Sequence, residues 1–133
     1  MNKYMNIIGI KAKRACEHKV SNKLKNKVLN YYAKLLDKEK KFILSQNLKD
    51  VKFAKKIKLK ENLINRLQLN EKKLASIKNS IIKIAKLKDP VNNILEKWKR
   101  PNGLHINKVS IPIGVIGVIY ESRPNVTSDV ASL

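Results

Sequence analysis

Residues able to do chemistry follow the most apolar stretch of the chain. That stretch runs from Val115 to Tyr120, and Arg123 and Asn125 come shortly after it. An arginine here can make a charge-assisted contact to a phosphate or a carboxylate. An asparagine amide can donate to an oxygen that gains negative charge during a reaction. The strand, loop and helix start over residues 115–133 are therefore predicted to hold a site for an anionic group, and the alternative is an ordinary turn with a solvated arginine.

Other residue types offer less chemistry. Cys16 is the only cysteine, which excludes an internal disulfide and a cysteine-based metal cluster. Its neighbours Ala12 and Ala15 favour a small packing residue on a helix. His18 and His105 have no cysteine or acidic companion at metal-ligand spacing, so we expect no metal site. Glycine-rich phosphate-binding motifs are absent.

Charge gives a second hypothesis. The chain of 133 residues has a net charge of +20, which is compatible with a basic helical nucleic-acid-binding module. However, only four of its 30 basic residues are arginines, the type that reads bases and binds phosphates bidentately. We therefore favour a lysine-rich surface with no specific nucleic-acid partner. The longest apolar run, Ile111 to Tyr120, is too short to span a membrane, so we expect no membrane partner.

Residues 1–90 are expected to be helical. Apolar residues recur at helical spacing in four stretches, and Ser21 is placed to cap the first of them. These apolar positions are Val20, Leu24, Val28, Tyr31, Tyr32 and Leu35; Leu44, Leu48 and Val51; Leu63, Ile64 and Leu67; and Leu74, Ile77, Ile81, Ile84 and Ala85. The last stretch predicts a helix over 70–88, ended by Asp89 and Pro90.

Residues 91–110 are expected to form a β-hairpin. Strands are predicted over 94–100 and 104–110, joined by the turn residues Pro101, Asn102 and Gly103. The run Val115–Tyr120 is apolar on both faces, which is typical of a central strand covered by helices on both sides. A helix is predicted to begin near Thr127 or Ser128. Because the chain supplies no neighbours for such a strand, we expect an incomplete α/β fold.

The run from Ile111 to Leu133, IPIGVIGVIYESRPNVTSDVASL, closely resembles the signature of the γ-glutamyl phosphate reductases, also called glutamate-5-semialdehyde dehydrogenases. Its first part is similar to the wider aldehyde dehydrogenase superfamily, and residues 120–125 narrow the resemblance to this family. Residues 47–51, 62–67 and 89–91 resemble the family's helical amino-terminal region. The resemblance implies an amino-terminal fragment of an aldehyde-dehydrogenase-like fold. Its implied parts are a helical part over 1–90, an oligomerisation hairpin over 91–110, and the truncated first strand of a Rossmann-like NADP-binding sheet over 111–133.

The resemblance also implies a reaction. In the family, a catalytic cysteine displaces phosphate from γ-glutamyl phosphate, and NADPH reduces the resulting thioester to glutamate-5-semialdehyde on the way to proline. That cysteine lies far downstream in the family, and Cys16 is not in its motif. The chain alone is therefore expected to be inactive. The family further implies a cytoplasmic homo-oligomer with a functional link to glutamate 5-kinase.

The resemblance also implies site residues. In the superfamily, the loop after this first strand of the sheet lies beside the nicotinamide half of the cofactor, and the loop of this chain is matched to it. The match implies that Asn125 binds the oxyanion and that Arg123 binds the substrate. Cofactor contacts are implied for Ile119, Tyr120, Glu121 and Pro124. A third hypothesis, a stand-alone oligomerisation or scaffold protein, needs only the helices and the hairpin.

Overall fold

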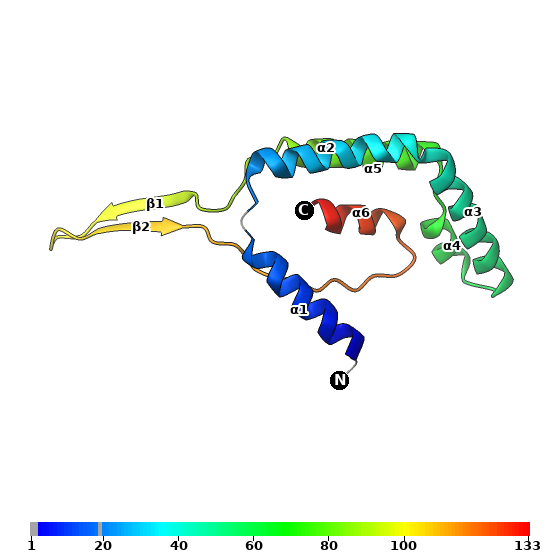
Figure 1. The fold of residues 1–133 in the computed structure, drawn as a ribbon, viewed down its shortest axis with the longest axis horizontal. Coiled ribbons are helices and arrows are strands. Elements are labelled where there is room, and N and C mark those ends of the chain that lie inside the picture. Colours follow the sequence, from blue (N-terminus) through cyan, green and yellow to red (C-terminus); the bar gives the residue numbers. More distant parts are fainter. Residues whose placement is uncertain (1–2, 19) are drawn as a thin grey trace. The chain divides into compact units, whose positions relative to one another are not determined.

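A computed structural model describes residues 3–18 and 20–133 of the chain (Figure 1). The chain divides into two compact units, which are described separately: residues 1–20 with 88–117, here called the hairpin unit, and residues 21–87 with 118–133, here called the helical unit. In chain order the elements are α1 (Lys3–Glu17), α2 (Asn22–Lys38), α3 (Lys40–Lys56), α4 (Glu61–Leu67), α5 (Glu71–Ala85), β1 (Ile94–Lys99), β2 (His105–Val109) and α6 (Pro124–Ser132).

Side-chain caps fix the first residues of α2 and α5. The Oγ of Ser21 accepts a hydrogen bond from the Leu24 N–H at 3.3 Å, which confirms the predicted cap of α2. The Oδ1 of Asn70 accepts from the Lys73 N–H at 2.8 Å at the start of α5. The predicted helix over 70–88 is confirmed, although α5 ends at Ala85, ahead of the Asp89–Pro90 pair.

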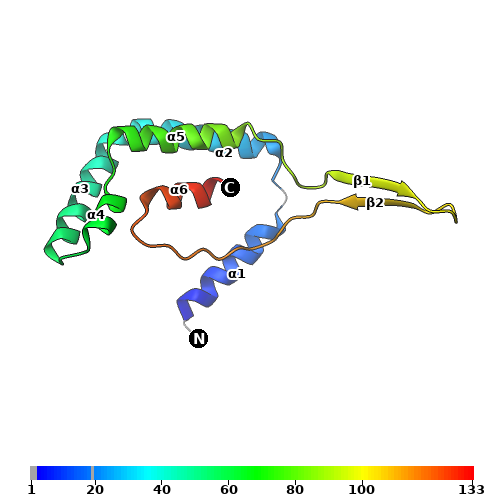
Figure 2. The same cartoon turned by 180° about the vertical axis from the view of Figure 1, so that it is seen from behind.

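The core of the helical unit lies between α2 and α5, which run side by side (Figure 2). Its buried members are Ala33, Leu36, Leu74, Ile77 and Ile81. Ile81 is only 1% exposed. Ala33 lets the two backbones approach closely because its side chain is a single methyl group. The apolar stripe predicted on α5 is therefore confirmed as a core face.

The face that α2 buries differs from the prediction. Leu24, Val28 and Tyr31 of α2 are exposed, as is Val20 ahead of the helix, and each keeps at least 45% of its accessible surface. The helix instead turns Ala33 and Leu36 towards α5, with Leu29 and Tyr32 partly buried beside them. Because α2 carries apolar residues on two faces, periodicity alone could not select the face that packs.

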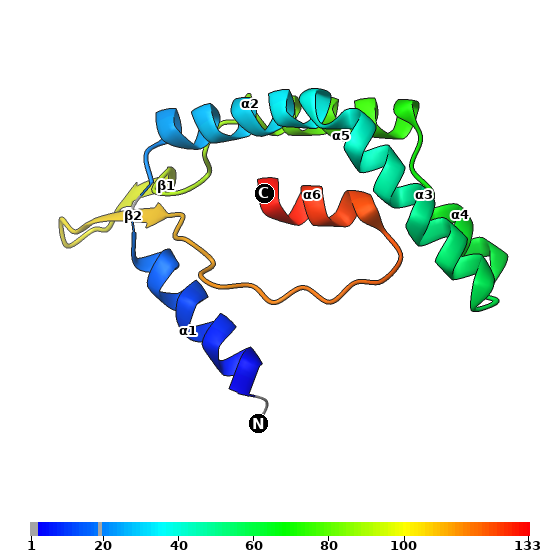
Figure 3. The same cartoon turned by 45° about the vertical axis from the view of Figure 1, so that its right-hand side comes forward.

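Helices α3 and α4 pack against each other beside the α2–α5 pair (Figure 3). The turn after α3 satisfies the last carbonyls of the helix with two backbone bonds. The Lys58 N–H donates to the Lys55 carbonyl and the Leu59 N–H donates to the Ala54 carbonyl, both at 3.0 Å. This is the Schellman pattern, and Lys58, with φ of 54°, holds the left-handed position usually taken by glycine.

A buried asparagine ties α3 to the segment that joins α4 to α5. Asn47 is 5% exposed. Its Nδ2 donates to the Leu67 carbonyl at 2.9 Å, and its Oδ1 accepts from the Leu69 N–H at 2.7 Å. One side chain therefore satisfies a donor and an acceptor of the linker and fixes the position of residues 67–69.

The hairpin unit contains the predicted antiparallel pair of β1 and β2, which is confirmed with Trp98 opposite Ile106 and Lys99 opposite His105. Gly103, with φ of 87°, allows the turn. Every residue of β1 is exposed. Helix α1 also buries no residue, and the packing role predicted for Cys16 is wrong because this side chain is exposed.

The strand predicted over Val115–Tyr120 is not present. Residues 111–120 are exposed and belong to no helix or strand, and the sheet of the described residues contains β1 and β2 alone. A strand is defined by ladder bonds to a neighbour, and this segment has none among the described residues. Helix α6 also begins at Pro124 instead of Thr127, because proline is favourable in the first helical turn. The fold is thus mainly helical with one hairpin. Within the described part of the chain, no helix is both long and apolar enough to cross a bilayer.

Candidate functional site

The predicted site loop leads directly into α6 and is largely open to solvent. Ile119 is fully exposed, Tyr120 keeps 45% of its surface, and Glu121 and Arg123 are exposed. The Tyr120 hydroxyl is 2.8 Å from the Thr127 Oγ1, which ties the loop to the first turns of α6. Tyr120 therefore fixes the loop to the helix, and the side chains of Ile119 and Glu121 beside it are exposed to solvent.

Asn125 lies in the first turn of α6. Its Nδ2 donates to the Asp129 Oδ2 at 3.2 Å, one turn further along the helix. That contact uses one of the two amide hydrogens, so the other hydrogen and the carbonyl oxygen remain for a ligand. Asp129 thus orients the Asn125 amide, and one N–H stays available to a ligand.

Contacts between α5 and α6 set the position of Asn125. The small residues Ser128 and Ser132 are buried on the inner face of α6. The Ser132 Oγ donates to the Ser128 carbonyl at 2.8 Å, inside the helix. Small side chains let α6 lie close to its neighbour, and Asn125 is brought to the α4–α5 region by this packing.

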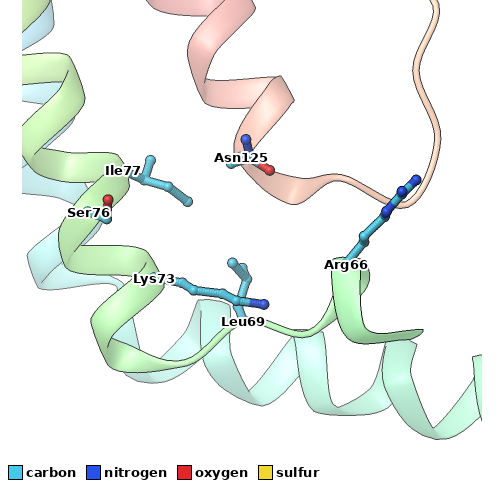
Figure 4. Close-up of a pocket in the computed structure, with 6 residues that line it drawn as sticks. All are labelled: Arg66, Leu69, Lys73, Ser76, Ile77 and Asn125. Carbon is cyan, nitrogen blue, oxygen red and sulfur yellow. The ribbon is translucent and has the colours of Figure 1, made fainter. Parts of the chain in front are cut away.

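Asn125 lines a hollow of about 280 Å³ together with residues from the end of α4, the following linker and α5 (Figure 4). The residues that line it are Arg66, Leu69, Lys73, Ser76, Ile77 and Asn125. Leu69 and Ile77 give the hollow an apolar wall, while Arg66, Lys73 and Asn125 give it polar groups. All six belong to the helical unit.

The two cationic residues of the hollow differ in their bonding. The Lys73 Nζ donates to the carbonyls of Asn65 at 3.0 Å and of Gln68 at 2.6 Å, so it stabilises the end of α4. The Arg66 side chain forms no hydrogen bond or ion pair with any described residue. Its guanidinium is therefore available to a ligand.

The structure brings only one of the sequence-predicted site residues into this hollow. Asn125 lines it, whereas Arg123 and residues 119–121 do not. Arg66, Lys73 and Ser76 were not predicted as site residues. The sequence did not single out Arg66, because it is one of four arginines beside 26 lysines and the rarity of arginine applies to all four. No cluster of metal-binding side chains occurs among residues 3–18 and 20–133.

Comparisons with known proteins agree on one group of relatives, although no model of a protein family matches the chain. A γ-glutamyl phosphate reductase of Nautilia profundicola is 47% identical over 114 residues, which cover 86% of this chain and 28% of that protein. One from Caldanaerobacter subterraneus is 45% identical over 131 residues, covering 95% of this chain and 32% of the relative.

Solved structures give the same result. The crystal structure of γ-glutamyl phosphate reductase from Thermotoga maritima matches with a TM-score of 0.80 and 39% identity, over 92% of this chain and 30% of that one. The Saccharomyces cerevisiae enzyme matches with a TM-score of 0.85 and 29% identity, over 91% of this chain and 31% of that one.

Sequence and fold together define the chain as homologous to part of an oxidoreductase. It is a homologue of the γ-glutamyl phosphate reductases, which confirms the family resemblance predicted from the sequence. The chain spans about 30% of the length of these relatives.

Proposed function

We propose that this chain supplies part of an NADPH-dependent enzyme that reduces γ-glutamyl phosphate to glutamate-5-semialdehyde and phosphate in proline biosynthesis. The observation that carries the proposal is the 51% identity to a γ-glutamyl phosphate reductase of Thermoanaerobacter, over 82% of the chain. The fold match to two solved reductases supports it. The proposed setting is a cytoplasmic homo-oligomer with a functional link to glutamate 5-kinase.

Asn125 is proposed to stabilise the negatively charged oxygen of the reacting carbonyl carbon. Its exposed amide at the start of α6 keeps a free N–H, and the helix amino terminus adds a favourable dipole. Arg123, which is exposed immediately before α6, is proposed to hold the phosphate or carboxylate of the substrate. Both residues would act on charge that the substrate carries or develops.

The loop before α6 fits a role beside the cofactor. Ile119 is fully exposed and offers an apolar surface to a flat ring, and Tyr120 is held by Thr127. With Glu121 and Pro124, these residues are proposed to contact the nicotinamide half of NADPH. The bound cofactor would supply the hydride, and the loop would orient its ring.

We expect this chain by itself to have no reductase activity. The reaction needs a cysteine nucleophile next to the substrate. Cys16 lies on α1 in the hairpin unit, outside any nucleophile motif, whereas the proposed substrate residues lie in the helical unit. The nucleic-acid alternative rests on net charge alone, and we expect such binding to be weak and to fall steeply as salt rises.

A chimera tests the proposed function. The corresponding segment of the Thermotoga maritima reductase is replaced by this chain, and NADPH oxidation is measured with γ-glutamyl phosphate. We expect turnover, and we expect Asn125→Ala in the same chimera to lower kcat by about 10²–10³. A folded chimera without turnover, beside an active parent enzyme, contradicts the proposal. Unchanged kcat in the Asn125→Ala chimera would remove the oxyanion role.

A further inference from the structure

The hollow at the start of α6 has a charge pattern that the proposed roles leave unused. Its wall is made by α4, α5 and α6, and its volume of about 280 Å³ is enough for a small group of atoms. Arg66 and Lys73 bring positive charge, and no acidic side chain lines it. A single sign of charge in a concave surface concentrates the electric field on a ligand of the opposite sign.

Arg66 is the residue free to bind such a ligand. Its guanidinium has five N–H donors in a planar fork that matches two oxygens of a carboxylate or phosphate. None of these donors is used by a described residue. The salt bridges among the described residues are made by lysines at other positions, as in the pairs Lys40–Glu71 and Lys78–Asp37.

Lys73 on α5 and Asn125 on α6 form two further sides of the hollow. The Lys73 ammonium uses two donors on the carbonyls of Asn65 and Gln68, which leaves one donor and the full positive charge near the hollow. Asn125 closes the hollow on the α6 side, and its one free N–H stays with the oxyanion role proposed above. Asn47 holds the linker that carries Leu69 and follows Arg66, so the wall of the hollow is fixed by a buried hydrogen-bonded side chain.

We propose that this hollow is a binding site for the oxyanion group of a small molecule, a carboxylate or a phosphate, with Arg66 as its bidentate ligand. The inference deepens the proposed function and rests on it for the identity of the ligand, since γ-glutamyl phosphate carries both kinds of group. Arg66 is then a residue that positions the substrate, in addition to Arg123.

Nuclear magnetic resonance titration of the chain tests this binding without any turnover. Glutarate and inorganic phosphate are the probes for the two kinds of anion, at about 0.15 M salt, where exposed charges more than about 8 Å apart are screened. We expect saturable shifts at the amides of residues 66, 69, 125 and 126. Shifts from glutarate only assign a carboxylate site, and shifts from phosphate only assign a phosphate site. Either result supports the proposal.

Two variants separate a site from the general charge of the chain. Arg66→Gln is expected to weaken binding about tenfold or more, because a bidentate charge-assisted contact is lost. Arg14→Gln on α1 removes the same charge in the other unit and is expected to leave the affinity unchanged. Arg66→Lys should fall between wild type and Arg66→Gln, since it keeps the charge but not the fork.

The proposal is overturned if both glutamine variants weaken binding equally, or if the shifts spread over the lysine-rich surface. If Arg66→Gln fails to fold, the amide shifts of the wild-type chain decide whether the anion binds at residues 66, 69, 125 and 126. An active chimera with no anion binding at residue 66 would defeat this inference alone. Anion binding at residue 66 with an inactive chimera would instead defeat the proposed function.

Discussion

The helical unit and the hairpin unit differ in how they use apolar residues. All buried apolar residues among the described ones belong to the helical unit, where α5 packs against α2 and α6. The hairpin unit has regular ladder bonds between β1 and β2, yet every residue of β1 is exposed, Trp98 included. Hydrogen bonds alone close a hairpin without giving it a core.

This difference shows which of the two units can stabilise itself. Burial of apolar surface is the main favourable term in folding, and the helical unit obtains it from its own residues. A two-stranded hairpin in water is marginally stable at best. The hairpin unit is therefore expected to be the less stable of the two. Four experiments test that comparison, beginning with the one expected to give the largest effect.

Hydrogen exchange compares the two kinds of segment directly. The amide of Ile81 should exchange at least about a thousandfold more slowly than the amides of Val115–Tyr120, because it opens only when the α2–α5 core opens. Residues 115–120 belong to no helix or strand and should exchange almost as in an unfolded chain. Slow exchange at 115–120 in a chain shown to be monomeric by light scattering would mean that this segment is protected within the chain after all.

Ile81→Ala tests the core of the helical unit. The change removes the most buried large side chain and leaves a cavity, so the free energy of unfolding should fall by about 2–5 kcal/mol. Urea denaturation followed by circular dichroism measures it. Leu24→Ala on the exposed face of α2 is the matched control, expected within about 0.5 kcal/mol of wild type. Similar losses from both changes would show that α2 uses the face predicted from its sequence.

Asn47→Ala tests the tie between α3 and the linker. The change leaves the Leu69 N–H and the Leu67 carbonyl without their partner, which should cost about 1–3 kcal/mol in denaturation. Asn30→Ala is the control, because Asn30 makes only an exposed bond to the Asn26 carbonyl. Equal losses of unfolding free energy from the two changes would show that the Asn47 hydrogen bonds do not stabilise the fold.

Trp98→Ala should have the smallest effect on the helical unit. Trp98 keeps 41% of its surface exposed in β1, and the helical unit does not contain it. The urea midpoint of the helical signal should therefore change by less than about 0.5 kcal/mol in free energy. A larger change would show that the two units stabilise each other in solution.

The sequence predicted local elements better than contacts between them. The Ser21 cap, the α5 stripe and the turn at Gly103 each depend on residues a few positions apart, and each is present. The packing face of α2 and the bonding of Asn47 depend on partners far along the chain, which no local pattern reveals. The run 115–120 has the composition of a strand, but a strand also requires a neighbour to pair with.

In the candidate site too, the sequence predicted a local feature but not a contact between distant residues. Asn125 was predicted from its position after an apolar run, and it is exposed at the start of a helix. Arg66 is far from Asn125 in sequence, and only the packing of α6 on α5 brings both to one hollow. The rarity of arginine in a lysine-rich chain does not distinguish Arg66 from the other three arginines, and it does not say what each arginine faces.

The turn after α3 limits which residues are accepted at position 58. Lys58 occupies a left-handed position that costs a residue with a side chain about 1 kcal/mol, whereas glycine accepts it freely. The turn keeps its shape because two backbone bonds and the buried Ala54 determine it from either side. Proteins sit only slightly above the stability they need, so such a cost is tolerated where neighbours are robust. Position 58 is thus expected to accept glycine at least as well as lysine, whereas a β-branched residue there is expected to destabilise the turn.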